Sequence, residues 1–263
     1  MLDSKNFAAG FAAPQGITQR AQRGTRILSS KSGKISFEDV KAGKLDTHVE
    51  TADQFVDEIV STARSSGTER ARKAADVLAA WDRQAENTSV GTLLFYKFMT
   101  AAGSSFENIG GFKVPTDDAK PLETPRGFRD PAKAVTMLDK VAGDVEKEYG
   151  TLNVKWGDVM RFRRGNSDLP GNGAPSQLGA IRTINVGPFV NGKTEAISGD
   201  TFFGVIEFST PQRAEVLLGY GNWSKKGSKH VDDQLPLLSR KEMRPMWRDR
   251  TVIEANLEAR KTF

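Results

Sequence analysis

The spacing of apolar residues changes near residue 150, and this change constrains the fold of the 263-residue chain more than any other feature. Before it, apolar residues such as Phe55, Ile59 and Val60 recur at the spacing of amphipathic helices. After it, short runs such as 201–208 are rich in β-branched and aromatic residues and are bounded by Gly and Pro, which indicates strands. Helices followed by strands predict an α+β fold with a mainly antiparallel β region.

The same pattern divides the chain into regions. We expect one unit over 1–263 with a helical region (36–102), a connection (103–131), a helix (132–150), a β-rich region (151–222) and a C-terminal tail (223–263). Strands are expected at 152–164, 180–186, 201–208 and 214–220, with a loop at 165–179 and a largely buried strand at 201–208. Ser36 and Thr68 suit helix N-caps, and Gly150 suits a helix end. Residues 1–35 have weak periodicity, which predicts extended chain.

Composition excludes several kinds of chemistry. The chain has no Cys, which rules out disulfides, thiolate metal sites and a cysteine nucleophile. Its two histidines, His48 and His230, leave little room for a histidine-based metal centre. No run approaches the roughly 18 consecutive apolar residues of a membrane span. The first residues lack the basic and apolar parts of a signal peptide.

Charge gives a weaker constraint. Lys and Arg number 38 against 33 acidic residues, and the formal net charge is +5. The excess lies in 20–34 and 225–250, and acidic residues interrupt the second cluster. The chain has no helix-turn-helix, zinc-finger or RNP-like motif. We therefore expect no nucleic-acid partner and interpret both clusters as solvated or subunit-facing surface.

Two segments contain histidine together with other reactive side chains. Ser228, His230 and Asp233 lie within six residues of one another, which is reminiscent of a hydrolytic triad. Triads are assembled from separated elements by geometry, so we favour a polar loop in which His230 bonds to the backbone. We interpret His48 as a surface or helix-capping residue.

Carboxylate pairs and a glycine-rich segment are further candidates. Asp117-Asp118 and Asp232-Asp233 lack the regular spacing of a calcium loop, which favours solvated acids. The segment 169–175 has neither a GxGxxG motif nor a following Lys-Ser/Thr, so it does not predict a phosphate site. The residues by themselves therefore reveal no active site.

Several short motifs occur in a fixed order along the chain. They are QRAQR (19–23), AADVLAAWDRQA (74–85), SVGTLLF (89–95), TPRG (124–127), LPGNG (169–173), SGDT (198–201), YGN (220–222) and GSKH (227–230). In type and order they resemble the penicillin acylase family, bacterial N-terminal-nucleophile amidohydrolases that include acyl-homoserine lactone acylases. The resemblance covers nearly the whole chain. It implies a partial αββα N-terminal-nucleophile hydrolase fold, the C-terminal part of a β-subunit.

The resemblance also implies a mechanism. In the family a precursor cleaves itself, and the Ser that then begins the β-subunit is the nucleophile, with its own α-amine as the base. Backbone N–H groups and an Asn side chain stabilise the oxyanion. Here Ser4 follows three other residues and does not match that nucleophile, and the oxyanion Asn has no counterpart. The resemblance therefore predicts that this chain is inactive alone.

Arg20 is the catalytic residue that the resemblance predicts, because the family has an Arg downstream of the oxyanion Asn that orients the catalytic groups. The alternative for Arg20 is an ion pair with a surface acid. We expect Trp81 in the core, with Asp82 and Arg83 in structural roles. No cofactor is expected, apart from a structural calcium that the family implies and whose ligands are not identified in this sequence.

The resemblance leaves several functions open. The first is hydrolysis of a linear amide, either the acyl side chain of a β-lactam or an N-acyl-homoserine lactone, by an intact enzyme. The missing N-terminal part or an α-subunit would then be the partner, and intact family members are periplasmic or secreted. The second is a non-catalytic protein that binds a ligand or complements another chain, and the third is a degenerate fragment without activity. No membrane partner is expected.

Overall fold

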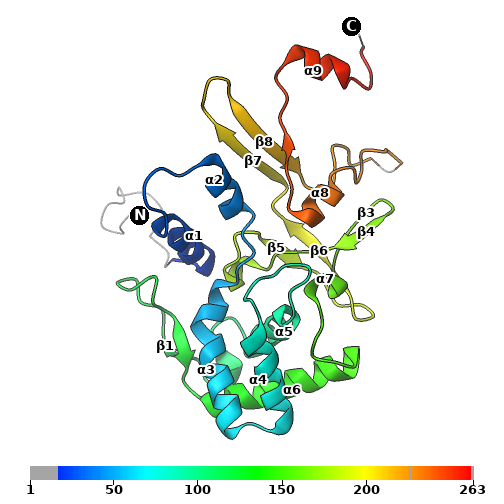
Figure 1. Ribbon diagram of the computed structural model, residues 1–263. Coiled ribbons are helices and arrows are strands. Elements are labelled where there is room, and N and C mark those ends of the chain that lie inside the picture. Colours follow the sequence, from blue (N-terminus) through cyan, green and yellow to red (C-terminus); the bar gives the residue numbers. More distant parts are fainter. Residues whose placement is uncertain (1–16, 226, 262–263) are drawn as a thin grey trace, which may run out of the picture.

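The computed structural model describes residues 17–225 and 227–261, and within these ranges helices precede most strands (Figure 1). The lower part of the view holds four helices, α3 (Glu50–Ser66), α4 (Glu69–Ala80), α5 (Thr92–Ala102) and α6 (Pro131–Tyr149). Most of the strands lie above them, whereas β1 (Phe112–Val114) lies beside α3, and the chain ends at the top. The fold is α+β, as predicted.

Local sequence signals explain where these helices begin and end. Ser36 caps α2 (Phe37–Lys44): its Oγ accepts from the Asp39 N–H at 3.1 Å, and the Asp39 carboxylate accepts from the Ser36 N–H at 3.0 Å. Thr68 caps α4 through a bond from the Ala71 N–H. Gly150 ends α6 with a positive φ of 72°, which glycine adopts without steric cost. These three predictions are confirmed.

An aromatic cluster forms the core between α3 and the segment that follows α5. The Phe55 ring lies 4.6 Å from Phe106, which stacks on Phe128 at 5.3 Å between ring centroids. The predicted connection 103–131 therefore contains structure, namely the 3₁₀ turn η2 (Glu107–Ile109) and the paired strands β1 (Phe112–Val114) and β2 (Arg126–Phe128). Phe106 precedes the turn and Phe128 ends β2, and both are buried against Phe55 of α3.

The first sheet of the β region has four strands in the order β4-β3-β6-β5. Its members are β3 (Met160–Arg164), β4 (Ser167–Pro170), β5 (Ile184–Val186) and β6 (Thr194–Gly199). Only β3 and β6 pair in parallel, so the β region is mainly antiparallel, as expected. Three boundaries differ from the prediction. A helical turn, α7 (Trp156–Val159), precedes β3, the predicted loop contains β4 and the 3₁₀ turn η3 (Ser176–Leu178), and the strand predicted at 180–186 begins at Ile184.

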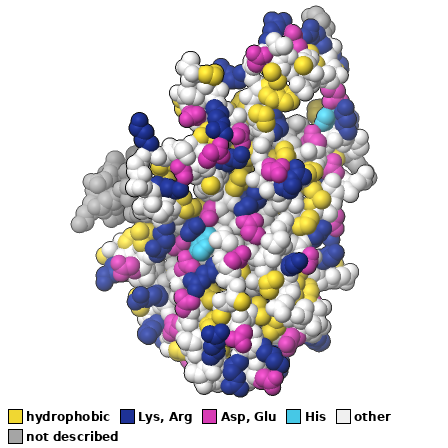
Figure 2. Space-filling model, viewed as in Figure 1, with side chains coloured by type: hydrophobic (Ala, Val, Ile, Leu, Met, Phe, Trp, Pro, Cys, Tyr) yellow, Lys and Arg dark blue, Asp and Glu magenta, His cyan; other side chains and the backbone are white. Residues whose placement is uncertain are grey.

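A second sheet contains β7 (Phe202–Glu207), β8 (Arg213–Leu218) and β9 (Arg244–Pro245), with β7 at its edge. Phe203 and Val205 face the core, whereas Phe202 is 61% exposed and Ile206 is 48% exposed. The prediction of a largely buried strand is therefore wrong for one face. Among the described residues nothing covers that face. Figure 2 shows hydrophobic side chains at several places on the surface, the upper part of the molecule included.

The tail contains two short helices besides β9. The helix α8 (Leu235–Arg240) buries Leu235 and Leu238 against the first sheet, whereas α9 (Arg250–Ala255) buries no residue. No helix in the two described ranges combines the length and the apolar character that crossing a bilayer requires.

The N-terminal region differs most from expectation. The prediction of extended chain is wrong for α1 (Gln19–Ser29), which Thr18 caps through a bond from the Ala21 N–H at 3.2 Å. Its polar side chains find distant partners: the buried Gln22 donates to the Thr124 carbonyl at 2.8 Å and accepts from Gln54 at 2.8 Å. A helix held by polar contacts of this kind does not need regularly spaced apolar residues, so its sequence does not predict a helix. The expectation for 1–16 lies outside the described residues.

Candidate functional site

Two arginines of α1 hold carboxylates from the segment before α3 and from the first residue of α3. Arg23 makes a bidentate pair with Asp46, through Nε to Oδ2 at 2.7 Å and Nη2 to Oδ1 at 2.9 Å. Arg26 donates Nε to Glu50 Oε1 at 2.5 Å, and the Glu50 side chain is fully buried. Charge-assisted and bidentate bonds of this kind fix geometry as well as energy. They orient α1 on the molecule.

Arg20, the predicted catalytic residue, lies one turn before Arg23 on α1. Its Nη2 donates to the Ile181 carbonyl at 3.3 Å and lies 3.7 Å from Asp200 Oδ1. Lys44 Nζ lies 2.6 Å from the other oxygen of the same carboxylate. Two cations therefore share Asp200, and the Arg20 side chain remains 37% exposed. Its role in catalysis stays a prediction.

A third cation, Arg182, stands behind this pair, and it was not singled out from the sequence. Its side chain is buried, with the guanidinium carbon 5.6 Å from the Phe162 ring centroid and 5.0 Å from that of Phe203. Within the described ranges the guanidinium donates no hydrogen bond, and its Nε is buried without a partner. Burial lowers the pKa of Arg182 to about 10, although Asp200 and Tyr220 favour the charged form.

Arg182 therefore remains protonated at neutral pH. The signal in the sequence was a single charged residue, Arg182, within the run 180–186 that was predicted to be a strand. A charged residue in such a run is buried only when its surroundings compensate the charge. Arg20, Lys44 and Arg182 together with Asp200 are called the cation cluster below.

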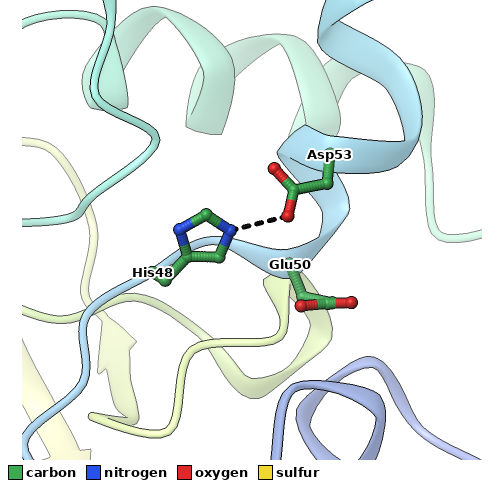
Figure 3. A group of neighbouring side chains, drawn as sticks. All are labelled: His48, Glu50 and Asp53. Carbon is green, nitrogen blue, oxygen red and sulfur yellow. Dashed lines mark hydrogen bonds and ion pairs between the residues drawn. The ribbon is translucent and has the colours of Figure 1, made fainter. Parts of the chain in front are cut away.

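His48, Glu50 and Asp53 lie together at the start of α3 (Figure 3), with ligand atoms within 4.8 Å of one another. His48 Nε2 lies 2.8 Å from Asp53 Oδ2, and Nδ1 lies 3.2 Å from Gln84 Nε2. The ring therefore bridges the first turn of α3 and the loop after α4. His48 was interpreted as a surface or helix-capping residue, but Val49 is the N-cap of α3 and the His48 ring bonds to two side chains, so it does not cap the helix.

The carboxylates of this group already have cationic partners. Arg26 holds Glu50, and Arg83 donates to Asp53 Oδ1 at 2.9 Å. Burial disfavours the charged form of Asp53, but hydrogen bonds from His48 and Arg83 lower the pKa of Asp53 overall. Calcium takes six to eight oxygen ligands, whereas this group offers one imidazole and two paired carboxylates. It does not fit the structural calcium that the resemblance implied, and we interpret it as an ion-pair network.

Ser228, His230 and Asp233 are close together but do not form a triad. Ser228 Oγ accepts from the His230 backbone N–H at 3.1 Å, so the hydroxyl stabilises the backbone of its own loop. The two ring nitrogens of His230 lie 2.8 Å from Asp233 Oδ2 and 2.6 Å from Glu258 Oε2. The loop is polar, as expected, but the expected bond from the His230 ring to the backbone is replaced by two carboxylates.

His230 is expected to titrate above the ordinary histidine range. Hydrogen bonds to Asp233 and then to Glu258 raise the pKa of His230, because both carboxylates favour the imidazolium. Since the folded-state pKa is raised, the stabilisation is present at low pH and is lost as pH rises through the folded-state value. Chemical shifts of the ring protons, followed by NMR between pH 5 and 9, measure this pKa directly.

Two variants provide the controls for this titration. Asp233→Asn and Glu258→Gln each remove one carboxylate charge and should each lower the pKa of His230, and the double variant should lower it furthest. A wild-type pKa at or below about 6.5, the value of an unperturbed histidine, contradicts the assignment.

The remaining sequence candidates have structural roles. Asp117 Oδ1 accepts from the Ala119 N–H at 2.8 Å in a turn, and Asp232 Oδ2 accepts from the Ser167 hydroxyl at 2.8 Å. In the glycine-rich segment, the buried Asn172 donates to the Leu238 and Ser239 carbonyls. These contacts join the end of the first sheet to α8.

The WDR motif is structural, as predicted. Trp81 is buried and its indole Nε1 donates to the Gln84 carbonyl at 2.9 Å. The Asp82 carboxylate accepts from the Ser89 hydroxyl at 3.0 Å and from the Gln84 N–H at 2.9 Å. The motif thus fixes the turn between α4 and α5.

Comparison with known sequences gives the class of the protein. The sequence model of the penicillin amidase family matches residues 3–255, so the chain belongs to this family. The match covers the span over which the motifs resembled it.

Particular relatives are similar to this chain over a part of their own length. An acyl-homoserine lactone acylase PvdQ of Pseudomonas fluorescens is 28% identical over 87% of this chain and 30% of the relative. The protein of the same name in Pseudomonas savastanoi pv. phaseolicola is 28% identical over 93% of this chain and 32% of the relative. The chain thus spans about a third of the length of these relatives. Among solved structures, a thermostable penicillin G acylase from Alcaligenes faecalis is 13% identical over 93% of this chain and 52% of its own, with a TM-score of 0.45.

Proposed function

We propose that this chain is the C-terminal part of an acylase that hydrolyses a linear amide to a carboxylic acid and an amine. The family match over residues 3–255 carries the proposal. N-acyl-homoserine lactones are the first substrate class, because the relatives described above are named as acyl-homoserine lactone acylases. The acyl side chains of β-lactams are the second.

In this proposal the chain positions catalytic groups that a further segment supplies. The nucleophilic Ser, its α-amine and the oxyanion Asn belong to that segment, and Arg20 is a positioning residue that orients them. The bond from Arg20 to the Ile181 carbonyl and its proximity to Asp200 support this role, because they fix the position of a partly exposed guanidinium. The reaction uses no cofactor.

A non-catalytic role is the second candidate. In that case the chain complements another polypeptide without contributing to turnover. The uncovered face of β7, with Phe202 and Ile206 exposed, suits such a contact.

One experiment separates the two candidates. The polypeptide that carries these residues is purified from its source cells, its intact mass is measured, and release of free homoserine lactone from its decanoyl amide is assayed. We expect a mass above 28.8 kDa or a co-purifying segment, together with turnover, and no turnover by residues 1–263 alone. Turnover by residues 1–263 alone contradicts the division of catalytic groups. A 28.8 kDa species without turnover favours the non-catalytic role.

Arg20 is tested in the same assay. Arg20→Ala should lower kcat by at least about tenfold, roughly 1.4 kcal/mol of barrier, with KM changed by less than about twofold. Arg20→Lys should recover part of the loss, because it keeps a cation near Asp200. Arg64→Ala, which removes an exposed ion pair with Asp76 on the opposite part of the chain, is the matched control and should leave kcat unchanged. An equal loss in Arg64→Ala would contradict the positioning role.

A further inference from the structure

An apolar hollow of about 270 Å³ lies between α1 and α2. Its apolar lining comes from Gly24, Ile27, Leu28, Ile35, Val40 and Ile181. Its volume is close to the lower limit for small-molecule sites, about 300–1,000 Å³, which suits a narrow, unbranched group better than a fused ring system.

The two lysines that line the hollow differ in their surroundings. Lys31 lies 2.5 Å from Asp39, and both residues line the hollow, so the charge at that end is neutralised there. Lys44 also lines the hollow, but its partner Asp200 does not. Asp39 lies in the first turn of α2 and Lys44 is its last residue, so the two lysines mark opposite ends of the hollow.

The Lys44 end carries excess positive charge. Asp200 is shared by Lys44 and Arg20, and the buried Arg182 has no carboxylate of its own among the described residues. The cation cluster thus holds three positive groups and one negative group. The nearby Arg23 does not change this balance, because Asp46 pairs with it. Ile181 connects the two features, since its side chain lines the hollow and its carbonyl accepts from Arg20.

We propose that the hollow and the cation cluster together bind a linear acyl carboxylate. The alkyl chain lies in the hollow between α1 and α2, and the carboxylate lies at Lys44 and Arg20. Arg182 stands behind them and contributes positive potential from a site of low polarity, where charges interact more strongly than in water. The ligand class rests on the proposed function, since amide hydrolysis by an acylase releases such an acid.

Binding is measured directly on residues 1–263 by isothermal titration calorimetry, with no hydrolysis involved. The probes are hexanoate, octanoate and decanoate, each below its micellar concentration. Burial of a methylene contributes about 0.8 kcal/mol, so affinity should rise up to about fourfold for each added methylene. Decanol, which has the chain without the charge, and acetate, which has the charge without the chain, should each bind at least about tenfold more weakly than decanoate.

Three variants locate the two parts of the ligand. Lys44→Met keeps the alkyl stem and removes the charge, and should weaken decanoate at least about tenfold. Lys31→Met is the matched control at the other end of the hollow and should change affinity less than about twofold. Gly24→Leu fills the hollow from α1, where an added Cβ meets only the Ile181 Cδ1 atom at 3.8 Å, and should weaken decanoate at least about tenfold.

The fold of each variant is checked by its thermal midpoint. Leucine favours helix over glycine, so Gly24→Leu should not lower this midpoint. Ala132→Leu, on the exposed face of α6, is the control for an added leucine and should bind decanoate as the wild type does.

Three results would overturn the proposal: no decanoate binding, equal binding of decanol and decanoate, or a larger loss in Lys31→Met than in Lys44→Met. Each leaves the turnover assay of the source protein unaffected, so failure of this site and failure of the acylase function are distinguishable.

Discussion

Replacement of Trp156 by alanine should lower the free energy of unfolding by roughly 3–5 kcal/mol, as expected for truncation of a buried tryptophan. The Trp156 side chain is fully buried at the start of α7. Its indole Nε1 donates to the Gly173 carbonyl at 2.9 Å, its backbone N–H donates to the Ser89 carbonyl at 2.9 Å, and its ring lies 5.8 Å from the Tyr96 ring. One side chain thus joins the helical part to the glycine-rich segment of the β part.

Urea unfolding, followed by circular dichroism at 25 °C, measures this loss. Trp156→Phe keeps most of the apolar contact but leaves the Gly173 carbonyl without its donor, and should cost roughly 1–3 kcal/mol. Trp223→Ala removes a tryptophan that is 56% exposed and should change stability by no more than about 0.5 kcal/mol. A loss below about 1 kcal/mol in Trp156→Ala would show that the cavity collapses or that the two parts unfold separately.

Replacement of Arg182 by methionine should raise the free energy of unfolding by roughly 1–3 kcal/mol, whereas replacement of Trp156 lowers it. Burial of a charge costs several kcal/mol, and no carboxylate in the described residues bonds to this guanidinium. The contacts with the Phe162 and Phe203 rings return about 2 kcal/mol each when desolvated, which offsets only part of this cost. Methionine fills a similar space without the charge.

Arg182→Lys is the control that keeps the charge, and its free energy of unfolding is measured by the same urea unfolding. Lysine keeps the charge but loses the planar stacking between two aromatic rings, so this variant should be less stable than the wild type. If both variants are destabilised to the same extent, the guanidinium stabilises the fold and the desolvation argument fails. If Arg182→Met is more stable and also binds decanoate more weakly, the charge is retained for binding at a cost in stability.

The elements that could be predicted from the sequence are those with local causes. Ser36 and Thr68 bond to backbone groups within three residues, and Gly150 ends α6 by its own conformation, so each acts within one turn of chain. The helix α1 could not be predicted, because Gln22 is anchored to Thr124, 102 residues away in sequence. A polar residue with a distant polar partner gives no periodic signal.

In the candidate site, too, some features could be predicted from the sequence and others depend on distant residues. The motif around Arg20 indicates the family, which the comparison confirms, because family motifs are properties of the sequence itself. Burial of Arg182 depends on Phe162 and Phe203, which reach it from two separate strands. The proximity of Ser228 and Asp233 to His230 in sequence could be seen, but the second carboxylate, Glu258, comes from 28 residues away.

The anchors of α1 differ greatly in when they become available during synthesis. The partners of Gln22, Arg23 and Arg26 all lie at or before Thr124, so α1 can dock once the helical part has left the ribosome. The contact between Arg20 and the Ile181 carbonyl spans 161 residues and waits for most of the β part. Non-local contacts of this kind form late because a long loop must close first. The cation cluster is therefore completed after α1 has docked, so an incomplete nascent chain has α1 in place but lacks the binding site.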